Sequence, residues 1–381
     1  MKLALTIILI SAAAFALLSV IAGLVLYLLG VRRGRETPVE EGSYGPYSER
    51  VLAGARWLDA QDMERLTMKS FDGLELVGYF LPAEGAPRGA MLLMHGYRST
   101  FKVDFSCSAK LLHELGFDLL LVYQRACGES GGKNICFGIK ERFDCRGWAR
   151  LLAAREPAGT PIFLYGLSLG CATVLMATGL ELPETVRGVV ADCGYTSPHA
   201  EFVHIIKRGR LSFFWPFYLS FRFWTRLLAG WGAKDCSAPE ALAANRIPVI
   251  FFHGGADRFV SPRFSVENFL ACRAEKELVL VEGDQQIVEE KDRAVAGFFI
   301  YDLAFRHPHG ERERSLLSLR AEFPAVPPVQ FEREVVPVNP VKRHAGPHLG
   351  VEIFAELFKK FVFFTESPAS HGGAFPSVRH V

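Results

Sequence analysis

One serine stands in a setting that is typical of a nucleophile. The run PIFLYGLSLG, residues 161–170, is a short apolar strand that leads into Gly166-Leu167-Ser168-Leu169-Gly170 and then into a helix rich in small residues. The two glycines let strand and helix pass close together at a strained turn. That turn would place the hydroxyl at the carboxyl end of a sheet, beside a helix amino terminus that stabilises negative charge. The pattern favours acyl transfer through Ser168, and the alternative is a serine that only caps the helix.

An aspartate that could serve this serine lies in the run PVIFFHGGADRFVSP, in the loop after another apolar strand. The carboxylate of Asp257 would orient a histidine and stabilise its imidazolium during proton transfer. The alternative is a local role, in which Asp257 closes an Asx-turn or caps a helix that begins near Ser261.

Donors for a developing oxyanion are expected in two places. A glycine-containing loop, His95-Gly96-Tyr97, follows the apolar run AMLLMH and can turn a backbone amide towards the reacting carbonyl. We expect the amides of Tyr97 and Leu169 to form the oxyanion hole. His95 closes a buried strand, and a histidine in that position is more often structural than a base.

The elements that would position these residues are apolar runs alternating with helical segments. The runs cover residues 90–95, 117–123, 161–165, 186–192, 248–253 and 277–282. Continuous apolar runs are typical of strands buried on both faces, and the helical segments between them include Glu141–Arg155 and Leu169–Gly179. A hairpin around Asp72-Gly73 precedes them. The sequence therefore predicts a mostly parallel sheet flanked by helices.

Two regions interrupt this alternation. Residues 199–240 include nine aromatic side chains between positions 211 and 231, and we expect them to form a helical lid inserted between two strands. Residues 306–381 are rich in proline, histidine and charge, and their one convincing element is an amphipathic run from Val351 to Phe364. We expect much of that tail to be poorly ordered.

Several motifs in a fixed order, spread over about residues 60–300, resemble the α/β-hydrolase superfamily. They are HGYRS, RACGESGG, GLSLG, ADCGYTSP and HGGADRFVSP. The resemblance extends to bacterial membrane-anchored members similar to the serine aminopeptidase and monoacylglycerol lipase-like group. It implies the α/β-hydrolase fold, and the order of serine before aspartate fits that fold. Relatives carry Asp-x-Arg-Gly/Ala-His-Gly after the fourth strand, where Tyr123, Ala126 and Cys127 replace three positions and Arg125 is retained.

The family's catalytic histidine is missing from its usual place, where this chain has Gln286. Glutamine cannot act as a general base near neutral pH. The histidines further along the chain are His307, His309, His344, His348, His371 and His380. His348 is the best placed, because its Gly-Pro-His-Leu-Gly turn leads into the amphipathic run; the alternative is a solvent-exposed tail histidine. The departure after Asp284 is either an insertion or a divergent end.

The amino terminus predicts a membrane anchor. Residues 3–30 carry no charge, and as a helix they would reach about 42 Å, more than the ~30 Å hydrocarbon core. A cleaved signal peptide is the alternative, although the apolar run continues to Leu29 beyond a possible site at Ala14-Phe15-Ala16. Lys2 precedes the run and three arginines follow it, which for a bacterial chain puts the catalytic part in the cytoplasm.

Composition narrows the class of protein. With 43 basic and 41 acidic residues the formal charge is +2, so the chain has no charge field suited to nucleic acid. Eight scattered cysteines without a paired motif favour a reducing compartment. The oligomeric state does not follow from these features.

We therefore expect an anchor at residues 1–30, a linker at 31–55, a hydrolase domain at 56–305 and an atypical tail at 306–381. The expected activity is hydrolysis of an ester, or less readily an amide, on a small apolar acyl substrate through an acyl-enzyme at Ser168. This chemistry needs neither a metal nor an organic cofactor. Two alternatives stay open: a catalytically inactive binding protein at the membrane, and an acyltransferase.

Overall fold

A computed structural model describes residues 2–281 apart from 37–38, 40–47, 209–213 and 256. The tail at 306–381, the amphipathic run within it, and both Gln286 and His348 lie outside the described residues.

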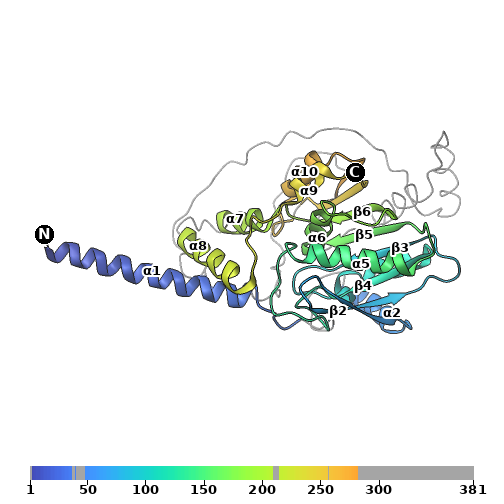
Figure 1. Ribbon diagram of the computed structural model, residues 1–381, viewed down its shortest axis with the longest axis horizontal. Helices are drawn as coiled ribbons and strands as arrows, with labels where there is room; N and C mark the ends of the chain where they lie inside the picture. Colours follow the sequence, from blue (N-terminus) through green and yellow to red (C-terminus); the bar gives the residue numbers. More distant parts are fainter. Residues whose placement is uncertain (1, 37–38, 40–47, 209–213, 256, 282–381) are drawn as a thin grey trace. The chain divides into compact units, whose positions relative to one another are not determined.

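An eight-stranded sheet forms the centre of the chain (Figure 1), in the order β1-β2-β4-β3-β5-β6-β7-β8. The strands are β1 (Glu64–Lys69), β2 (Glu75–Leu81), β3 (Gly89–Met94), β4 (Phe117–Val122), β5 (Ile162–Leu167), β6 (Val186–Asp192), β7 (Val249–Gly254) and β8 (Lys276–Val281). The first two pair antiparallel with each other and β2 pairs antiparallel with β4, whereas β3 to β8 are parallel. The predicted mostly parallel sheet and its leading hairpin are confirmed.

Both faces of the sheet are covered, which explains why its strands are continuous apolar runs. Successive residues of a strand point to opposite faces, and all six residues of β3 and of β4 are buried. On one face, Met91, Leu93 and Leu119 pack with Phe105 and Leu112 of the helices that follow β3.

Helices connect the strands. They are α2 (Ser48–Asp59), α3 (Phe101–Asp104), α4 (Ser106–Glu114), α5 (Glu141–Arg155), α6 (Leu169–Ala177), α9 (Ala238–Ala244) and α10 (Pro262–Ala271). Helices α2 and α4 pack on each other, α6 packs on β5 and β6, and α10 packs on β7 and β8. Helix α2 begins at Ser48, within the segment expected as a linker.

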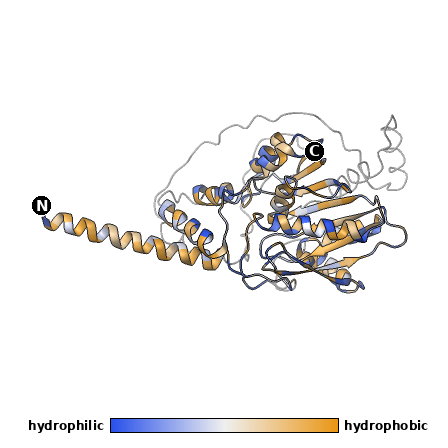
Figure 2. Ribbon diagram, viewed as in Figure 1, coloured by the Kyte–Doolittle hydropathy of each residue, from blue (hydrophilic) through white to orange (hydrophobic). Residues whose placement is uncertain are grey.

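The predicted helical insertion lies between β6 and β7. It contains α7 (Pro198–Arg208), α8 (Trp215–Trp224) and a π-helical turn, η4 (Thr225–Ala229). At the amino terminus, α1 (Lys2–Gly30) is long and apolar enough to cross a membrane, with a mean hydropathy of 2.6 over its best 18-residue window. A signal sequence would meet the same criterion. Figure 2 shows α1 and the central strands as the most continuously hydrophobic parts of the chain.

Candidate active site

Ser168 occupies a strained turn between β5 and α6. Its backbone has φ 54° and ψ −111°, a conformation that non-glycine residues rarely adopt. The residue stands at the N-cap position of α6, but its side chain makes no capping hydrogen bond. The capping alternative therefore does not account for this serine, and its hydroxyl is left for another role.

Glycines on both sides make the turn possible. A Cβ at Gly166 would overlap the carbonyl oxygen of Gly170, and a Cβ at Gly170 would overlap the carbonyl oxygen of Met94. An ideal Cβ at Gly96 would lie 3.5 Å from the Ser168 Cβ. The close crossing thus brings the loop after β3 directly beside the serine.

His95 holds this loop and is not available as a base. The backbone N–H of Gln124 donates to His95 Nε2 at 3.0 Å. The Nδ1–H of His95 donates to the carbonyl oxygen of Gly96, with the two atoms 2.8 Å apart. A ring that accepts at Nε2 must be neutral. Burial lowers the pKa of His95 to about 4.

The same bonds orient the candidate oxyanion amide of Tyr97. In a trans peptide the carbonyl of one residue and the N–H of the next point to opposite sides. Because the Gly96 carbonyl points to the His95 ring, the Tyr97 N–H points away from it. The Gly96 N–H is fixed separately, since it donates to Asp104 Oδ2 at 2.6 Å.

Asp104 was not identified from the sequence. Its carboxylate also accepts from the Ser99 hydroxyl at 2.6 Å, so it ties both ends of the Gly96–Ser99 segment together. Burial raises the pKa of the Asp104 carboxyl to about 6. A lone aspartate in the run RSTFKVDFS carries no local signal for this role, because its partner lies eight residues earlier in a loop of unknown shape.

The second candidate oxyanion donor, Leu169, is the first residue of α6. Amides in the first turn of a helix have no acceptor within that helix, and the earliest bond here runs from the Ala172 N–H to the Ser168 carbonyl at 3.0 Å. The Leu169 amide therefore points out of the helix end that carries the serine, where the helix dipole favours negative charge.

Asp257 lies at the same edge of the sheet as Ser168. Residues following β5 and β7 flank β6, so two strand spacings, about 10 Å, separate the strand ends. Its Oδ1 accepts from the amides of Phe259 and Val260 at 2.7 and 3.0 Å, which is the Asx-turn that the sequence left open. Its Oδ2 is buried and has no hydrogen-bond partner among the described residues. One oxygen is structural and the other is left for a further partner.

Glu201, in the first turn of α7, is a second carboxyl that the sequence did not single out. It is 4 % exposed, and neither of its oxygens has a hydrogen-bond partner in the described part of the chain. Burial, with a further contribution from the Asp257 carboxylate, raises the pKa of Glu201 well above its usual range. Glu201 therefore holds its proton more tightly than an ordinary glutamate does, and it stands electrostatically close to Asp257.

The histidines at the ends of β3 and β7, His95 and His253, are both engaged in hydrogen bonds. His253 lies 3.5 Å from Asp257 Oδ2, but its ring nitrogens already contact the Ser265 hydroxyl at 2.6 Å and the Val260 carbonyl at 3.0 Å. It is fully buried at the end of β7 and braces the Asp257 loop. The structure does not place His348, which lies outside the described residues.

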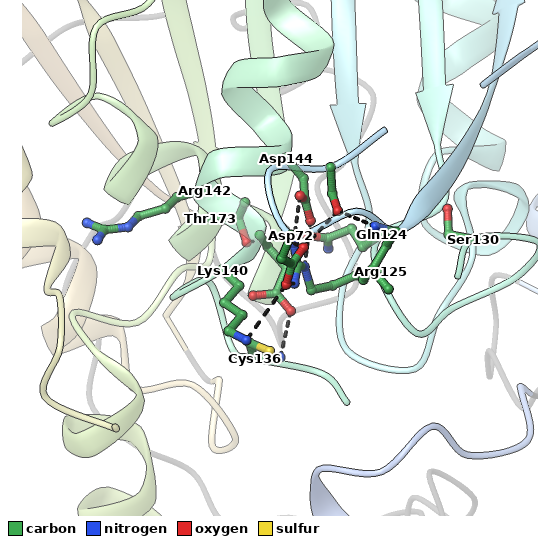
Figure 3. A network of polar contacts seen from close by, with 12 residues as sticks. Asp72, Gln124, Arg125, Ser130, Cys136, Lys140, Arg142, Asp144 and Thr173 are labelled. Carbon is green, nitrogen blue, oxygen red and sulfur yellow. Dashed lines mark hydrogen bonds and ion pairs between the residues drawn. The ribbon is translucent and has the colours of Figure 1, made fainter. Parts of the chain in front are cut away.

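A buried ion-pair network supports the loop after β4. Figure 3 shows Arg125 between Asp72 and Asp144, with bonds of 2.9 and 3.1 Å to the first carboxylate and 2.6 and 2.7 Å to the second. Both carboxylates raise the pKa of Arg125, which stays charged despite being 2 % exposed. Ser130 accepts from the Val77 amide at 2.8 Å and donates to the Tyr123 carbonyl at 2.7 Å. Arg125, the retained position of the motif, and Ser130 thus brace the loop after β4.

The carboxyl end of α1 contacts the loop after β3, which contains the candidate oxyanion amide of Tyr97. The Tyr97 hydroxyl donates to the Gly30 carbonyl at 2.8 Å, and the Arg98 guanidinium donates to the carbonyls of Leu29 and Arg32. Just beyond, Arg33 donates to the Ser130 carbonyl at 2.8 Å. The end of the apolar helix is therefore tied to the loop after β3 and to the loop after β4.

Comparison with known proteins agrees with this geometry. No family model matches the chain. The chain is similar to the uncharacterized protein YqkD of Bacillus subtilis (strain 168), at 23% identity over 225 residues that make up 58% of this chain and 72% of that protein. Among solved structures, the Pyrococcus furiosus esterase Pf2001 superposes with a TM-score of 0.54 at 17% identity, covering 72% of this chain and 99% of the esterase. This chain has the α/β-hydrolase fold.

Two further solved structures share that fold. The Pyrococcus horikoshii acylaminoacyl peptidase has a TM-score of 0.50 at 14% identity, covering 69% of this chain and 45% of that one. The 2,6-dihydroxy-pseudo-oxynicotine hydrolase has a TM-score of 0.50 at 18% identity, covering 64% and 68%. At these identities the similarity establishes only the fold of this chain. Its resemblance to the serine aminopeptidase and monoacylglycerol lipase-like group stays a prediction.

The network around Arg125 predicts a large stability effect. Replacing Arg125→Met leaves two carboxylates without their buried partner and should lower the free energy of unfolding by about 3–5 kcal/mol. The matched control is Arg263→Met, which removes an exposed ion pair to Glu267 and should cost less than about 1 kcal/mol. Urea unfolding in detergent measures both, and equal losses in the two variants would contradict this account.

Buried neutral His95 predicts a pH dependence. Its pKa is about 4 in the folded chain against 6.5 ordinarily, so below pH 6.5 the unfolded state binds a proton that the folded state does not. The free energy of unfolding should therefore fall by up to about 3 kcal/mol between pH 6.5 and pH 4 from this residue alone. In His95→Gln that contribution is absent, so the stability gap between wild type and variant should narrow as the pH falls. A gap that stays constant would show that His95 is not buried neutral.

Proposed function

We propose that this chain is a membrane-anchored serine hydrolase that cleaves an ester bond through an acyl-enzyme at Ser168. The observation that carries the proposal is the strained Ser168 turn, with a hydroxyl that caps nothing and a Cβ close to the Gly96 loop. A conformation of this kind costs free energy and persists where the surrounding structure and a function require it.

In the proposed reaction the Ser168 hydroxyl attacks the substrate carbonyl carbon, and its proton passes to a histidine base. The new oxyanion accepts hydrogen bonds from the amides of Tyr97 and Leu169. As the carbonyl re-forms, the protonated histidine donates to the departing alkoxide. Water then repeats the sequence on the acyl-enzyme, releasing the acid and restoring the serine.

The roles of Asp257 and His348 follow from the same proposal. The unpartnered Asp257 Oδ2 is the acceptor that a histidine Nδ1–H would need, and its Oδ1 is already held by two backbone amides, which fixes the carboxylate in place. His348 is the proposed base. Asp257 therefore orients the imidazole and stabilises its charged form, without itself taking the proton.

An apolar acyl substrate is supported by the aromatic insertion after β6. Phe217, Tyr218 and Phe221 form the buried side of α8, and Tyr218 and Phe221 pack with each other and with Phe202 of α7. The structurally similar proteins include an esterase and an acylaminoacyl peptidase, and of these two substrate classes we propose the ester.

Membrane anchoring through α1 is supported by its surface, since residues 2–18 are exposed although almost all are apolar. Such a surface is stable in lipid and unfavourable in water. In a bacterial chain, the arginines after α1 favour a cytoplasmic catalytic domain. All eight cysteines are free thiols, which suits that compartment.

Turnover of p-nitrophenyl esters by the full-length chain tests the function. Ser168→Ala should lower kcat/KM to background, a loss on the order of 10³-fold or more, and Asp257→Asn should lose on the order of 10²–10⁴-fold. His348→Ala should fall as far as Ser168→Ala. The matched control is Asp62→Asn. Asp62 is exposed in the loop after α2, so this variant should keep wild-type turnover.

The outcomes separate the proposed roles. Turnover that survives Ser168→Ala contradicts the nucleophile, and turnover that survives His348→Ala alone assigns the base to another residue. If the wild-type chain folds cooperatively but hydrolyses none of the p-nitrophenyl esters tested, the result supports the alternative of a catalytically inactive binding protein.

A further inference from the structure

Helix α8 presents an apolar stripe away from the catalytic domain. Trp215, Leu219 and Phe223 of α8 follow one another at steps of four and are 41%, 56% and 57% exposed, and Leu227 of the π-helical turn η4 that follows is 60% exposed. Residues four apart lie on the same side of an α-helix, so the three side chains of α8 form one continuous surface. A contiguous exposed apolar surface of this kind marks a place where another apolar partner binds.

The other side of α8 is already occupied. Phe217, Tyr218 and Phe221 are buried, and the Phe217 ring packs edge-on against Phe15 of α1 with centroids 5.9 Å apart. The stripe is therefore not the side by which α8 attaches to the rest of the chain.

Helix α8 lies side by side with the second half of α1 (Figure 1). Ser220 Oγ and Trp224 Nε1 both donate to the Val20 carbonyl, at 3.2 and 3.0 Å. A Cβ at Gly23 would overlap the Ser220 side chain, so glycine is what allows the two helices to approach so closely. The surface of α8 thus continues that of α1.

The length of α1 places this contact at membrane depth. The part of α1 that is exposed without interruption after Lys2 runs from Leu3 to Leu18, 16 residues or about 24 Å. A span needs about 20 residues to cross a hydrocarbon core of ~30 Å. A spanning α1 must therefore be in lipid up to about residue 22, which includes the stretch beside Phe217 and Ser220.

We propose that the α8 stripe contacts the acyl chains of the membrane leaflet on the side of the catalytic domain, so that the insertion after β6 is embedded in the membrane surface. The inference rests on the proposed anchoring by α1, and not on the catalytic roles. Arg222 and Arg226 are not part of the stripe: the Arg222 guanidinium lies 5.9 Å from the Tyr218 ring centroid, and Arg226 pairs with Asp235 at 2.7 Å. The stripe itself carries no charged side chain.

Site-specific photocrosslinking in the full-length chain tests the proposal. p-Benzoylphenylalanine replaces Leu219 or Phe223, and the chain is reconstituted in vesicles of phosphatidylcholine and phosphatidylglycerol that carry a tagged lipid. Ile10 of α1 is the lipid-exposed reference, and Leu270 of α10, which is 66% exposed, is the matched water-exposed control. All four positions are exposed, so the replacement displaces no buried side chain.

Positions 219 and 223 should crosslink to lipid at a yield close to that of position 10 and at least about tenfold above that of position 270. Lipid crosslinking at position 10 with yields at 219 and 223 no higher than at 270 would overturn the proposal and leave the anchor intact. Failure at position 10 as well would overturn the anchoring itself, and with it this inference.

Discussion

The crossing of β5, α6 and β3 at Ser168 is the constraint on which the site depends. Only glycine at positions 166 and 170 allows the helix to leave the strand against the Met94 carbonyl, and this close approach forces Ser168 into its positive φ. Any side chain at either glycine would push the helix away from the sheet. The serine, its amide donor at Leu169 and the Gly96 loop are therefore assembled by one steric requirement.

A polar layer then fixes the direction of the groups that the crossing brings together. Neutral His95 turns the Gly96–Tyr97 peptide, Asp104 holds the Gly96 amide, and Gln124 links the ring of His95 to the end of β4. Buried polar groups of this kind are stable only when nearly every donor and acceptor is paired. The unpartnered oxygens of Asp257 and Glu201 are exceptions within the described chain, and Asp257 Oδ2 is the atom to which the proposed base would bind.

The features that the sequence predicted are local ones. The six parallel strands were visible as apolar runs, the first two strands as a hairpin around Asp72-Gly73, and the Ser168 turn as a glycine-flanked serine between a strand and a helix. Each of these patterns is contained in about ten neighbouring residues. Asp104 and Glu201 were not predicted, since their roles come from burial and from partners that only the fold brings close. The contacts of α1 with α8, near Val20 and Ser220, join segments 200 residues apart, and no local sequence pattern indicates them.

Contacts join the end of α1 to the candidate site. Tyr97 and Arg98 bind the last carbonyls of α1, while Arg33 binds the Ser130 carbonyl, so the end of α1 contacts the loops after β3 and β4. A helix that only tethered the domain would need no such contacts. Helix α1 thus contacts both the insertion after β6 and the loop after β3, and the intact chain is the form in which the proposed activity is best measured.

Labelling of the full-length chain with a fluorophosphonate, followed by peptide mapping, tests the central claim most directly, because only an activated serine reacts rapidly with this probe. The account predicts a single adduct on the peptide that contains Ser168, and none in Ser168→Ala. An adduct on another serine, or no adduct in a wild-type chain that unfolds cooperatively, would contradict the claim that the strained turn carries a working nucleophile.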